Sequence, residues 1–305
     1  MAPYRILCLD GGGIKGLFTA TVLDRLQAQR PDLVANADLI AGTSTGGILA
    51  LGLASGKTPA ELAGLYRNEA KRIFDDSFWD DLIDLGNAVG SDYSNKGLKK
   101  ILKREFGAKT LAELGKQVLI PTFDLDADAT PERPRIWKPK FFHNFPGTDS
   151  DGDQPVVDVA LATSAAPTYF PSHKGFIDGG VVANNPSMAA VVQALDPRGG
   201  GKNLNDLAVL SLGTGLEPKF IRGNVDWGWG QWARPMVSLM ISGIMGVATF
   251  QCQQLLGEHY LRVDDVFDRG VDMDSTDDAT LVYLQQRGSA LDLDAAVTWL
   301  GNVGW

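Results

Sequence analysis

The sequence contains few cysteines, few histidines and fewer positive than negative charges. Its 305 residues include two cysteines and three histidines, and 28 Lys and Arg stand against 37 Asp and Glu, a net charge of −9. Two cysteines make no disulfide scaffold, so we expect a reducing, cytoplasmic setting. The negative charge argues against a nucleic-acid polymer as the main partner. It also argues against broad attraction to anionic lipid, so any membrane contact must be local and apolar.

The chain also lacks linkers, repeats, low-complexity tracts and clusters with metal-ligand spacing. We therefore expect one large α/β domain over 1–305 that needs neither metal nor cofactor. An apolar strand pattern begins at residue 4, which predicts no signal peptide at this end.

Apolar runs alternate between strand-like and helix-like spacing along the first two thirds of the chain. This alternation predicts a largely parallel sheet with helices on both faces. The predicted strands are 4–9, 39–41, 117–125, 135–142 and 207–212, and the predicted helices are 16–29 and 46–55. Thr58 and Thr110 each stand three residues before a glutamate, the signature of a helix start. Residues 74–95 mix aromatic, apolar and aspartate residues and are interpreted as a surface helix, with an irregular cap near the active site as the alternative.

The most informative segment runs from Gly42 to Gly46 and reads Gly-Thr-Ser-Thr-Gly. It follows one apolar run, 39–41, and precedes another, 48–54. This strand–turn–helix context is typical of a nucleophile elbow, with Ser44 at the apex and near the positive end of the following helix. The same pentapeptide also occurs in plain turns.

A glycine loop, Asp10 to Gly16, follows the first predicted strand and contains Gly11, Gly12 and Gly13 in succession. Backbone N–H groups in such a loop form a concave donor surface for a phosphate or an oxyanion. The loop can also be read as a dinucleotide fingerprint, but the acidic residue it requires would be Asp32, which falls in a polar loop. A glycine turn without a ligand remains the alternative.

A third segment, Asp178-Gly179-Gly180, places a carboxylate at the end of a short apolar strand. Alone it would be a common turn. In this order, the three segments resemble the patatin-like phospholipase family, whose pattern is D-G-G-G-x-[RK]-G, then G-x-S-x-G, then D-G-[GA]. The resemblance covers about residues 4–215, and further matching segments are 165–171, 184–186 and 211–215.

The resemblance implies a patatin-like three-layer α/β sandwich, with a motif-bearing core at 4–215 and a helical C-terminal part at 216–305. It also implies a calcium-independent lipid acyl hydrolase of the phospholipase A type, acting at a membrane surface. Ser44 would be the nucleophile, Asp178 its direct partner in a Ser–Asp dyad, and the N–H groups of Gly11–Gly13 the oxyanion hole. The supporting motif residues are Asp10, Lys15, Gly16, Gly42, Gly46, Gly179 and Gly180.

The histidines permit a dyad without histidine. Only His259 follows Asp178, as a catalytic triad in that order would require, and it looks like the end of a helix. His143 stands among phenylalanines and is expected to be packed, whereas His173 is expected to be a solvated loop residue. Lys15 is interpreted as a solvated lysine at a helix start; a cation that steers a lipid head group or rigidifies the loop is the alternative.

Residues 225–256 contain three closely spaced tryptophans and a mostly apolar run, 235–250. That run is too short for a good membrane span. It is interpreted as a buried helix, and a lid or interfacial segment is the alternative because tryptophans suit a membrane boundary.

Two other functions stay open. Some bacterial patatin-like phospholipases are switched on by cyclic nucleotides and degrade the cell membrane in antiphage defence, and the compact chain is compatible with such an effector. A non-catalytic lipid- or nucleotide-binding module is the other alternative, although it would leave Ser44, Asp178 and the glycine loop without a role. The sequence determines neither the head group, nor the acyl chain, nor the oligomeric state.

Overall fold

The computed structural model describes residues 3–73, 94–127, 134–167, 169–218, 220, 221, 223 and 226–305. The surface helix predicted for 74–95 lies almost wholly outside the described residues. Only its last two positions, Ser94 and Asn95, are described, and they precede helix α5 (Lys96–Phe106).

A seven-stranded sheet forms the centre of the molecule, in the order β4-β3-β2-β1-β6-β7, with β5 paired to β3. The pairs β1–β2, β1–β6, β2–β3 and β6–β7 are parallel, and β4 and β5 run antiparallel to β3. The strands are β1 (Tyr4–Leu9), β2 (Leu39–Gly42), β3 (Gln117–Ala127), β4 (Ile136–His143), β5 (Phe176–Asp178), β6 (Leu207–Leu212) and β7 (Tyr260–Val263).

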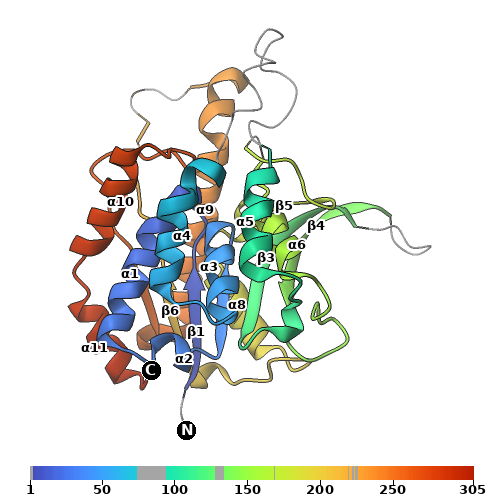
Figure 1. Ribbon diagram of the computed structural model, residues 1–305, viewed down its shortest axis with the longest axis vertical. Coiled ribbons are helices and arrows are strands. Elements are labelled where there is room, and N and C mark those ends of the chain that lie inside the picture. The colour runs from blue at the N-terminus through green and yellow to red at the C-terminus, as the bar shows by residue number, and fades with distance from the viewer. Residues whose placement is uncertain are drawn as a thin grey trace.

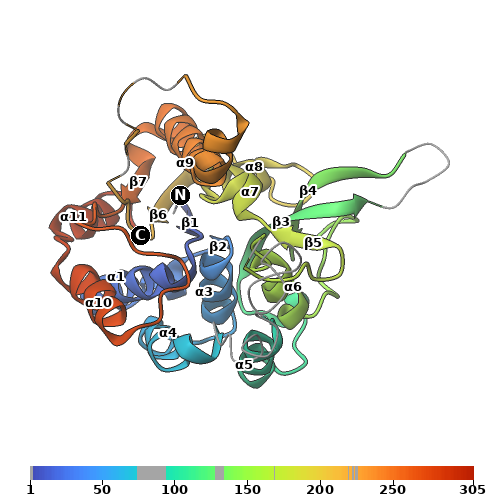
Figure 2. The ribbon, with the colours of Figure 1, turned by 90° about the horizontal axis from the view of Figure 1, so that it is seen from above.

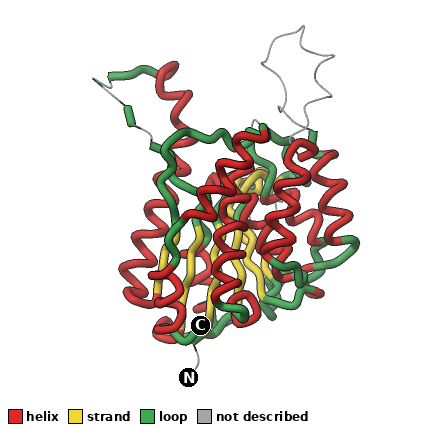
Figure 3. The backbone as a smooth tube through the Cα atoms, turned by 60° about the vertical axis from the view of Figure 1, so that its left-hand side comes forward, coloured by secondary structure: helices red, strands yellow, loops and turns green. Residues whose placement is uncertain are grey.

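Helices cover both faces of the sheet because successive strand residues point to opposite sides. In β1, Leu7 and Leu9 pack into one apolar cluster, whereas Ile6 and Cys8 pack into the other. The larger cluster is covered by α1 (Gly16–Gln29), α2 (Leu33–Asn36), α3 (Thr45–Ala54), α4 (Pro59–Ile73), α5 (Lys96–Phe106), α6 (Val156–Thr163), α10 (Asp278–Ala290) and α11 (Asp294–Asn302). The smaller cluster is covered by α8 (Ser187–Leu195) and α9 (Trp229–Leu256), with the short α7 (Gly180–Ala183) beside them. Figures 1 and 2 show the resulting three layers, and Figure 3 shows the strands between the helices.

The fold confirms the predicted three-layer α/β sandwich. The strands at 4–9 and 207–212 and the helix at 16–29 have the predicted bounds. The Thr58 start is a true helix cap, since its hydroxyl and N–H pair with Glu61. Thr110 forms a capping box too, but on a 3₁₀ turn, Leu111–Glu113. The C-terminal part is not only helical, because β7 extends the sheet.

Helix α9 is not the buried helix expected for 225–256. Of its 28 residues, the described ones that are buried are Ala248, Cys252 and Leu256, all near its C-terminal end. The stretch Pro235–His259 is long and apolar enough to cross a membrane by length and composition, and 11% of its most apolar window is buried. The expectation that it is too short is therefore wrong, because the helix continues past Phe250.

Candidate active site

Ser44 occupies a sharp turn between β2 and α3. Its backbone has φ 55° and ψ −122°, a conformation that residues other than glycine seldom adopt and that often marks a functional turn. The turn is too tight for side chains on either side. A Cβ at Gly42 would lie 2.0 Å from the carbonyl oxygen of Gly46, and one at Gly46 would lie 2.2 Å from that of Leu9.

Thr163, at the end of α6, holds this turn in place. The N–H of Ser44 donates to Thr163 Oγ1 at 2.9 Å, and that hydroxyl donates to the carbonyl oxygen of Pro121 at 2.7 Å. The turn is thereby fastened to β3 through a buried side chain. Thr163 belongs to no recognisable motif, so the sequence alone does not mark it as part of the site.

Asp178 lies at the end of β5, opposite Thr122 of β3, and its side chain is buried. One carboxylate oxygen accepts the N–H of Gly180 at 2.7 Å, and the Ser44 side chain lies close enough to the carboxylate to favour its ionised form. Burial raises the pKa of Asp178 to about 6, although the Ser44 side chain and the Gly180 N–H both lower it. The carboxylate is thus a stronger base than an ordinary aspartate, yet still ionised at neutral pH.

The glycine loop packs directly beside Ser44. A Cβ at Gly11 would lie 3.2 Å from the Cβ of Ser44 and 2.3 Å from Asn184 Oδ1. At Gly12 it would lie 2.5 Å from Thr214 Oγ1. Gly13 has φ 59°, and a Cβ there would lie 2.2 Å from the carbonyl oxygen of Met273. The three predicted segments therefore meet at one place.

The N–H groups of the loop are not equivalent. Gly11 donates its N–H to the carbonyl oxygen of Asn184 at 3.1 Å, so this donor is already engaged. The N–H groups of Gly12 and Gly13 have no hydrogen-bond acceptor among the described residues. Of the three amides expected to bind an oxyanion, the Gly11 N–H is therefore occupied, and those of Gly12 and Gly13 are the candidates that remain.

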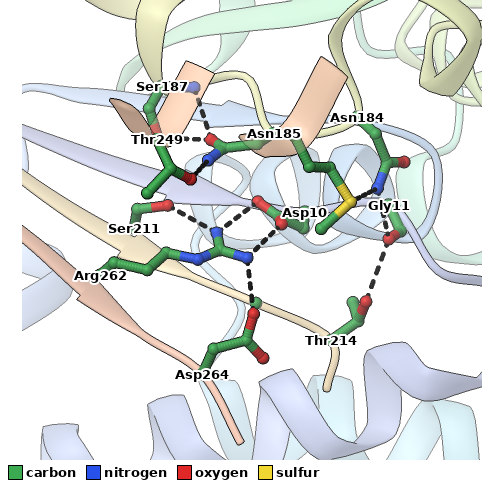
Figure 4. A network of polar contacts seen from close by, with 12 residues as sticks. Asp10, Gly11, Asn184, Asn185, Ser187, Ser211, Thr214, Thr249, Arg262 and Asp264 are labelled. Atoms are coloured by element: carbon green, nitrogen blue, oxygen red, sulfur yellow. Dashed lines mark hydrogen bonds and ion pairs between the residues drawn. The ribbon is translucent and has the colours of Figure 1, made fainter. Parts of the chain in front are cut away.

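Asp10 belongs to a buried ion network rather than to the group around Ser44. Arg262 of β7 donates to both carboxylate oxygens of Asp10, at 2.9 and 2.6 Å, and to Asp264 at 2.7 Å (Figure 4). Burial raises the pKa of Asp10 to about 6, and the Arg262 guanidinium counters this by favouring the ionised form. The network fixes the end of β1, from which the glycine loop starts.

Polar side chains outside the ion network also contact the glycine loop. Asn184 Nδ2 and Thr214 Oγ1 both donate to the carbonyl oxygen of Gly11 at 3.1 Å (Figure 4). Asn184 Nδ2 also reaches Met245 Sδ at 3.0 Å, and Asn185 Nδ2 donates to Thr249 Oγ1 at 3.1 Å. Helix α9 is therefore in direct contact with residues that hold the glycine loop.

The patatin-like phospholipase family model matches residues 7–191, which include all three segments. The chain belongs to this family. It is similar to a cGAMP-activated phospholipase of Pseudomonas aeruginosa (strain BWHPSA011 / Pa011), with 34% identity over 273 residues, 86% of this chain and 78% of that protein. It is also similar to the putative sporulation hydrolase CotR of Bacillus subtilis, with 35% identity over 233 residues, 75% of this chain and 68% of that protein. VipD of Legionella pneumophila matches in structure with a TM-score of 0.47 and 14% identity, over 99% of this chain and 67% of that one.

As a member of this family, the protein is a lipid acyl hydrolase. Its remaining motif residues support the site by packing. A Cβ at Gly16 would lie 2.1 Å from Thr45 Oγ1, and one at Gly179 would lie 2.2 Å from the carbonyl oxygen of Pro121. Lys15 is not a solvated lysine, since its ammonium pairs with Glu217 at 2.8 Å and its side chain is 12% exposed. This ion pair ties the glycine loop to the segment after β6.

The histidines of this phospholipase lie in three different environments. His143 is buried and packs edge-on against Phe145, as expected. His173 is not solvated, because Nε2 lies 2.8 Å from Asp158 and its side chain is 11% exposed. His259 ends an exposed 3₁₀ turn directly after α9. Within the described ranges, no three or more His, Cys, Asp or Glu side chains are grouped so that they could hold a metal ion.

Proposed function

We propose that the protein cleaves fatty acyl esters of phospholipids through a Ser44–Asp178 dyad and an acyl-enzyme intermediate. The observation that supports this most directly is the position of the Ser44 side chain beside the buried Asp178 carboxylate, whose ionised form it favours and which has no cationic partner among the described residues. The glycine loop beside Ser44 supplies donors for the oxyanion.

In the acylation step, the Ser44 hydroxyl gives its proton to Asp178 while its oxygen attacks the ester carbonyl. The carbonyl oxygen becomes an oxyanion, which accepts hydrogen bonds from the N–H groups of Gly12 and Gly13. When the tetrahedral intermediate collapses, the C–O bond to the lysolipid breaks, and the leaving alkoxide takes the proton from Asp178. The fatty acyl group remains esterified to Ser44.

Deacylation repeats the sequence with water as the nucleophile. Asp178 accepts a proton from the water, the hydroxide adds to the acyl carbonyl, and the same two amides hold the second oxyanion. Collapse then breaks the bond to Ser44, whose oxygen recovers the proton, and the fatty acid leaves. A base with a pKa of about 6 suits both steps, because it is ionised at neutral pH and still binds a proton well.

The direct test is hydrolysis of a soluble chromogenic ester and of phospholipid vesicles by the wild-type protein and Ser44→Ala. We expect both activities to disappear in the variant, with unchanged thermal unfolding. Ser55→Ala, a change of the same size at the end of α3, serves as the control. Equal activity of Ser44→Ala and wild type would exclude Ser44 as nucleophile. Vesicle binding without hydrolysis in either protein would favour the lipid-binding module.

We further propose that a cyclic nucleotide activates the enzyme and that it then degrades the membrane of its own cell as an antiphage effector. This is supported by relatives whose names describe cGAMP-activated phospholipases, among them proteins of Escherichia coli (32% identical) and Vibrio cholerae (32% identical) that each align with 94% of this chain. Hydrolysis of vesicles should rise when cGAMP is added. Turnover that is unchanged by cGAMP at saturating concentration, with no binding by calorimetry, would refute activation by this nucleotide and leave the dyad proposal intact.

A further inference from the structure

The outer side of α9 is apolar and exposed to an extent unusual for a surface helix. Val237 and Phe250 are 61% and 62% exposed, although both are large apolar residues. The name α9 face is used here for the large apolar side chains that this helix exposes between Pro235 and Phe250: Met236, Val237, Leu239, Met240, Val247 and Phe250. Contiguous exposed apolar side chains of this kind mark a surface that meets a partner or a membrane.

The α9 face carries no charge. From Pro235 to Gly257 the sequence contains no Asp, Glu, Lys, Arg or His, in a chain in which 21% of the residues are charged. Protein interfaces usually surround an apolar centre with a polar, charged rim. A helix without ionisable side chains over this length instead matches a hydrocarbon boundary, and the net charge of −9 means that lipid charge cannot supply the attraction.

The inner side of helix α9 contacts residues of the proposed cleavage site. Met245 of α9 contacts Asn184, which in turn holds the glycine loop at Gly11. Figure 1 shows the N-terminal part of α9 projecting beyond the other described helices, at the end of the sheet opposite the N terminus of the chain. The carboxyl ends of β1 and β2, which precede the glycine loop and Ser44, point to that same end.

A cavity of about 580 Å³ between α9 and the α7–α8 segment adds apolar surface on the same side. Met240 and Val247 of the α9 face line it together with Val182 and Ala183 of α7. Ala183 accepts a hydrogen bond from Thr43 Oγ1, so α7 stands between this cavity and the Ser44 turn. The apolar surface thus reaches from the α9 face to the element that directly follows Asp178.

From these observations we propose that the α9 face docks the enzyme on a lipid bilayer, with its apolar side chains entering the hydrocarbon boundary. The proposal rests on the proposed lipid hydrolysis, but it assigns a separate surface. Because docking depends on apolar contact, binding should occur on neutral phosphatidylcholine vesicles and should persist at high salt.

The test is flotation with phosphatidylcholine vesicles, carried out in the Ser44→Ala background so that the lipid stays intact. We compare Val237→Asp and the double variant Val237→Asp/Leu239→Asp with Val282→Asp. Val282 lies on α10, away from α9, and is 50% exposed, so the control makes the same chemical change at a similar exposure. We expect the double variant to lose roughly tenfold or more in vesicle partitioning, because a carboxylate is costly at the hydrocarbon boundary. Val282→Asp should bind like its parent.

The outcomes separate this proposal from the proposed function. Hydrolysis of a soluble ester, measured with Ser44 present, reports the dyad; if it is absent while the parent protein still floats, the dyad proposal fails and the docking proposal stands. Three results would overturn docking: the double variant floats like its parent, flotation of the parent requires anionic lipid and disappears in salt, or the parent does not float. Light scattering adds a fourth: a dimer that Val237→Asp/Leu239→Asp converts to a monomer, with vesicle binding unchanged, would assign the α9 face to a second copy of the chain.

Discussion

Two carboxylates, Asp10 and Asp178, lie buried near the glycine loop, and they differ in what they contact. In both cases burial raises the pKa to about 6. Asp10 is held by the two terminal nitrogens of the Arg262 guanidinium, whereas Asp178 meets a hydroxyl and a backbone N–H. The first carboxylate is neutralised by a fixed cation and cannot take up a proton without losing that pair. Among the described residues, the second has only neutral partners and is free to accept a proton.

The comparison teaches that burial alone does not identify a catalytic base. A buried carboxylate paired to a guanidinium is a structural element, and removal of one partner leaves an uncompensated charge. A buried carboxylate next to a hydroxyl can activate that hydroxyl, because the carboxylate accepts the hydroxyl proton without losing an ion pair. Substitution of the catalytic carboxylate should therefore change activity, whereas substitution in the ion pair should change stability.

The largest effect is expected for Asp178→Asn. The amide preserves the shape of the side chain but cannot accept the Ser44 proton, so ester turnover should fall by roughly 10²- to 10⁴-fold. Unfolding temperature should stay close to that of the wild type, because no ion pair is lost. Steady-state hydrolysis of a soluble ester together with calorimetric unfolding measures both quantities. Asp24→Asn, at an exposed position of α1, is the matched control. An active Asp178→Asn protein would remove Asp178 from the mechanism.

Arg262→Met should show the opposite pattern, with stability affected first. The substitution leaves the buried Asp10 and the partly buried Asp264 without their cation, which should lower the free energy of unfolding by about 3–5 kcal/mol. Urea titration followed by fluorescence measures this loss. Adding Asp10→Asn to Arg262→Met should recover part of it, because the uncompensated charge is removed. Arg198→Met breaks an exposed ion pair with Asp196 and should have little effect. If Arg262→Met were as stable as wild type, the network would not be what fixes the loop.

The sequence predicts the residues around Ser44 better than it predicts the ion pair between Asp10 and Arg262. Ser44, Asp178 and the glycines follow recognisable local patterns, since tight turns after strands require glycine and leave a marked motif. Arg262 is not marked in this way. It reaches Asp10 only because β7 lies beside β6, and β6 beside β1, so the pair joins residues 252 positions apart. Thr163 was missed for the same reason, as its hydroxyl acts through contacts made by folding.

Helix α9 shows a different limit of sequence analysis. A helix that is apolar on most sides is usually buried in a soluble protein, and that rule predicted a buried helix. The sheet face that α9 covers carries the smaller apolar cluster, so one narrow side, containing Cys252 and Leu256, suffices for packing. The local sequence pattern does not indicate that the other sides of the helix are left uncovered by the described residues.

A smaller effect is expected for Gly46→Ala, which tests how closely the end of β1 and the Ser44 turn must pack. The new methyl group would lie 2.2 Å from the carbonyl oxygen of Leu9 and 2.6 Å from that of Asp10. It would force the end of β1 away from the turn and should destabilise the protein by about 1–3 kcal/mol. Gly64→Ala, at another helical glycine with no atom within 4 Å of the new Cβ, should instead stabilise by about 0.5–1 kcal/mol. Chemical unfolding compares the two, and equal effects would contradict the packing argument.

The smallest effect is expected in the pH dependence of turnover, which reports which of the two carboxylates titrates during catalysis. Only ionised Asp178 can accept the Ser44 proton, and its pKa is raised from 3.8 to about 6. Activity should therefore be flat near pH 7 and fall below pH 6, by about tenfold at pH 5 relative to the plateau.

Unfolding does not cause this fall in activity. For both carboxylates the folded state binds the proton more tightly than the unfolded state, so their contribution to stability increases as the pH drops through this range. Soluble-ester kinetics from pH 5 to 8 should show the same midpoint in Asp10→Asn as in the wild type. A midpoint that moves with Asp10→Asn would mean that proton uptake at the ion pair, rather than at Asp178, limits the reaction.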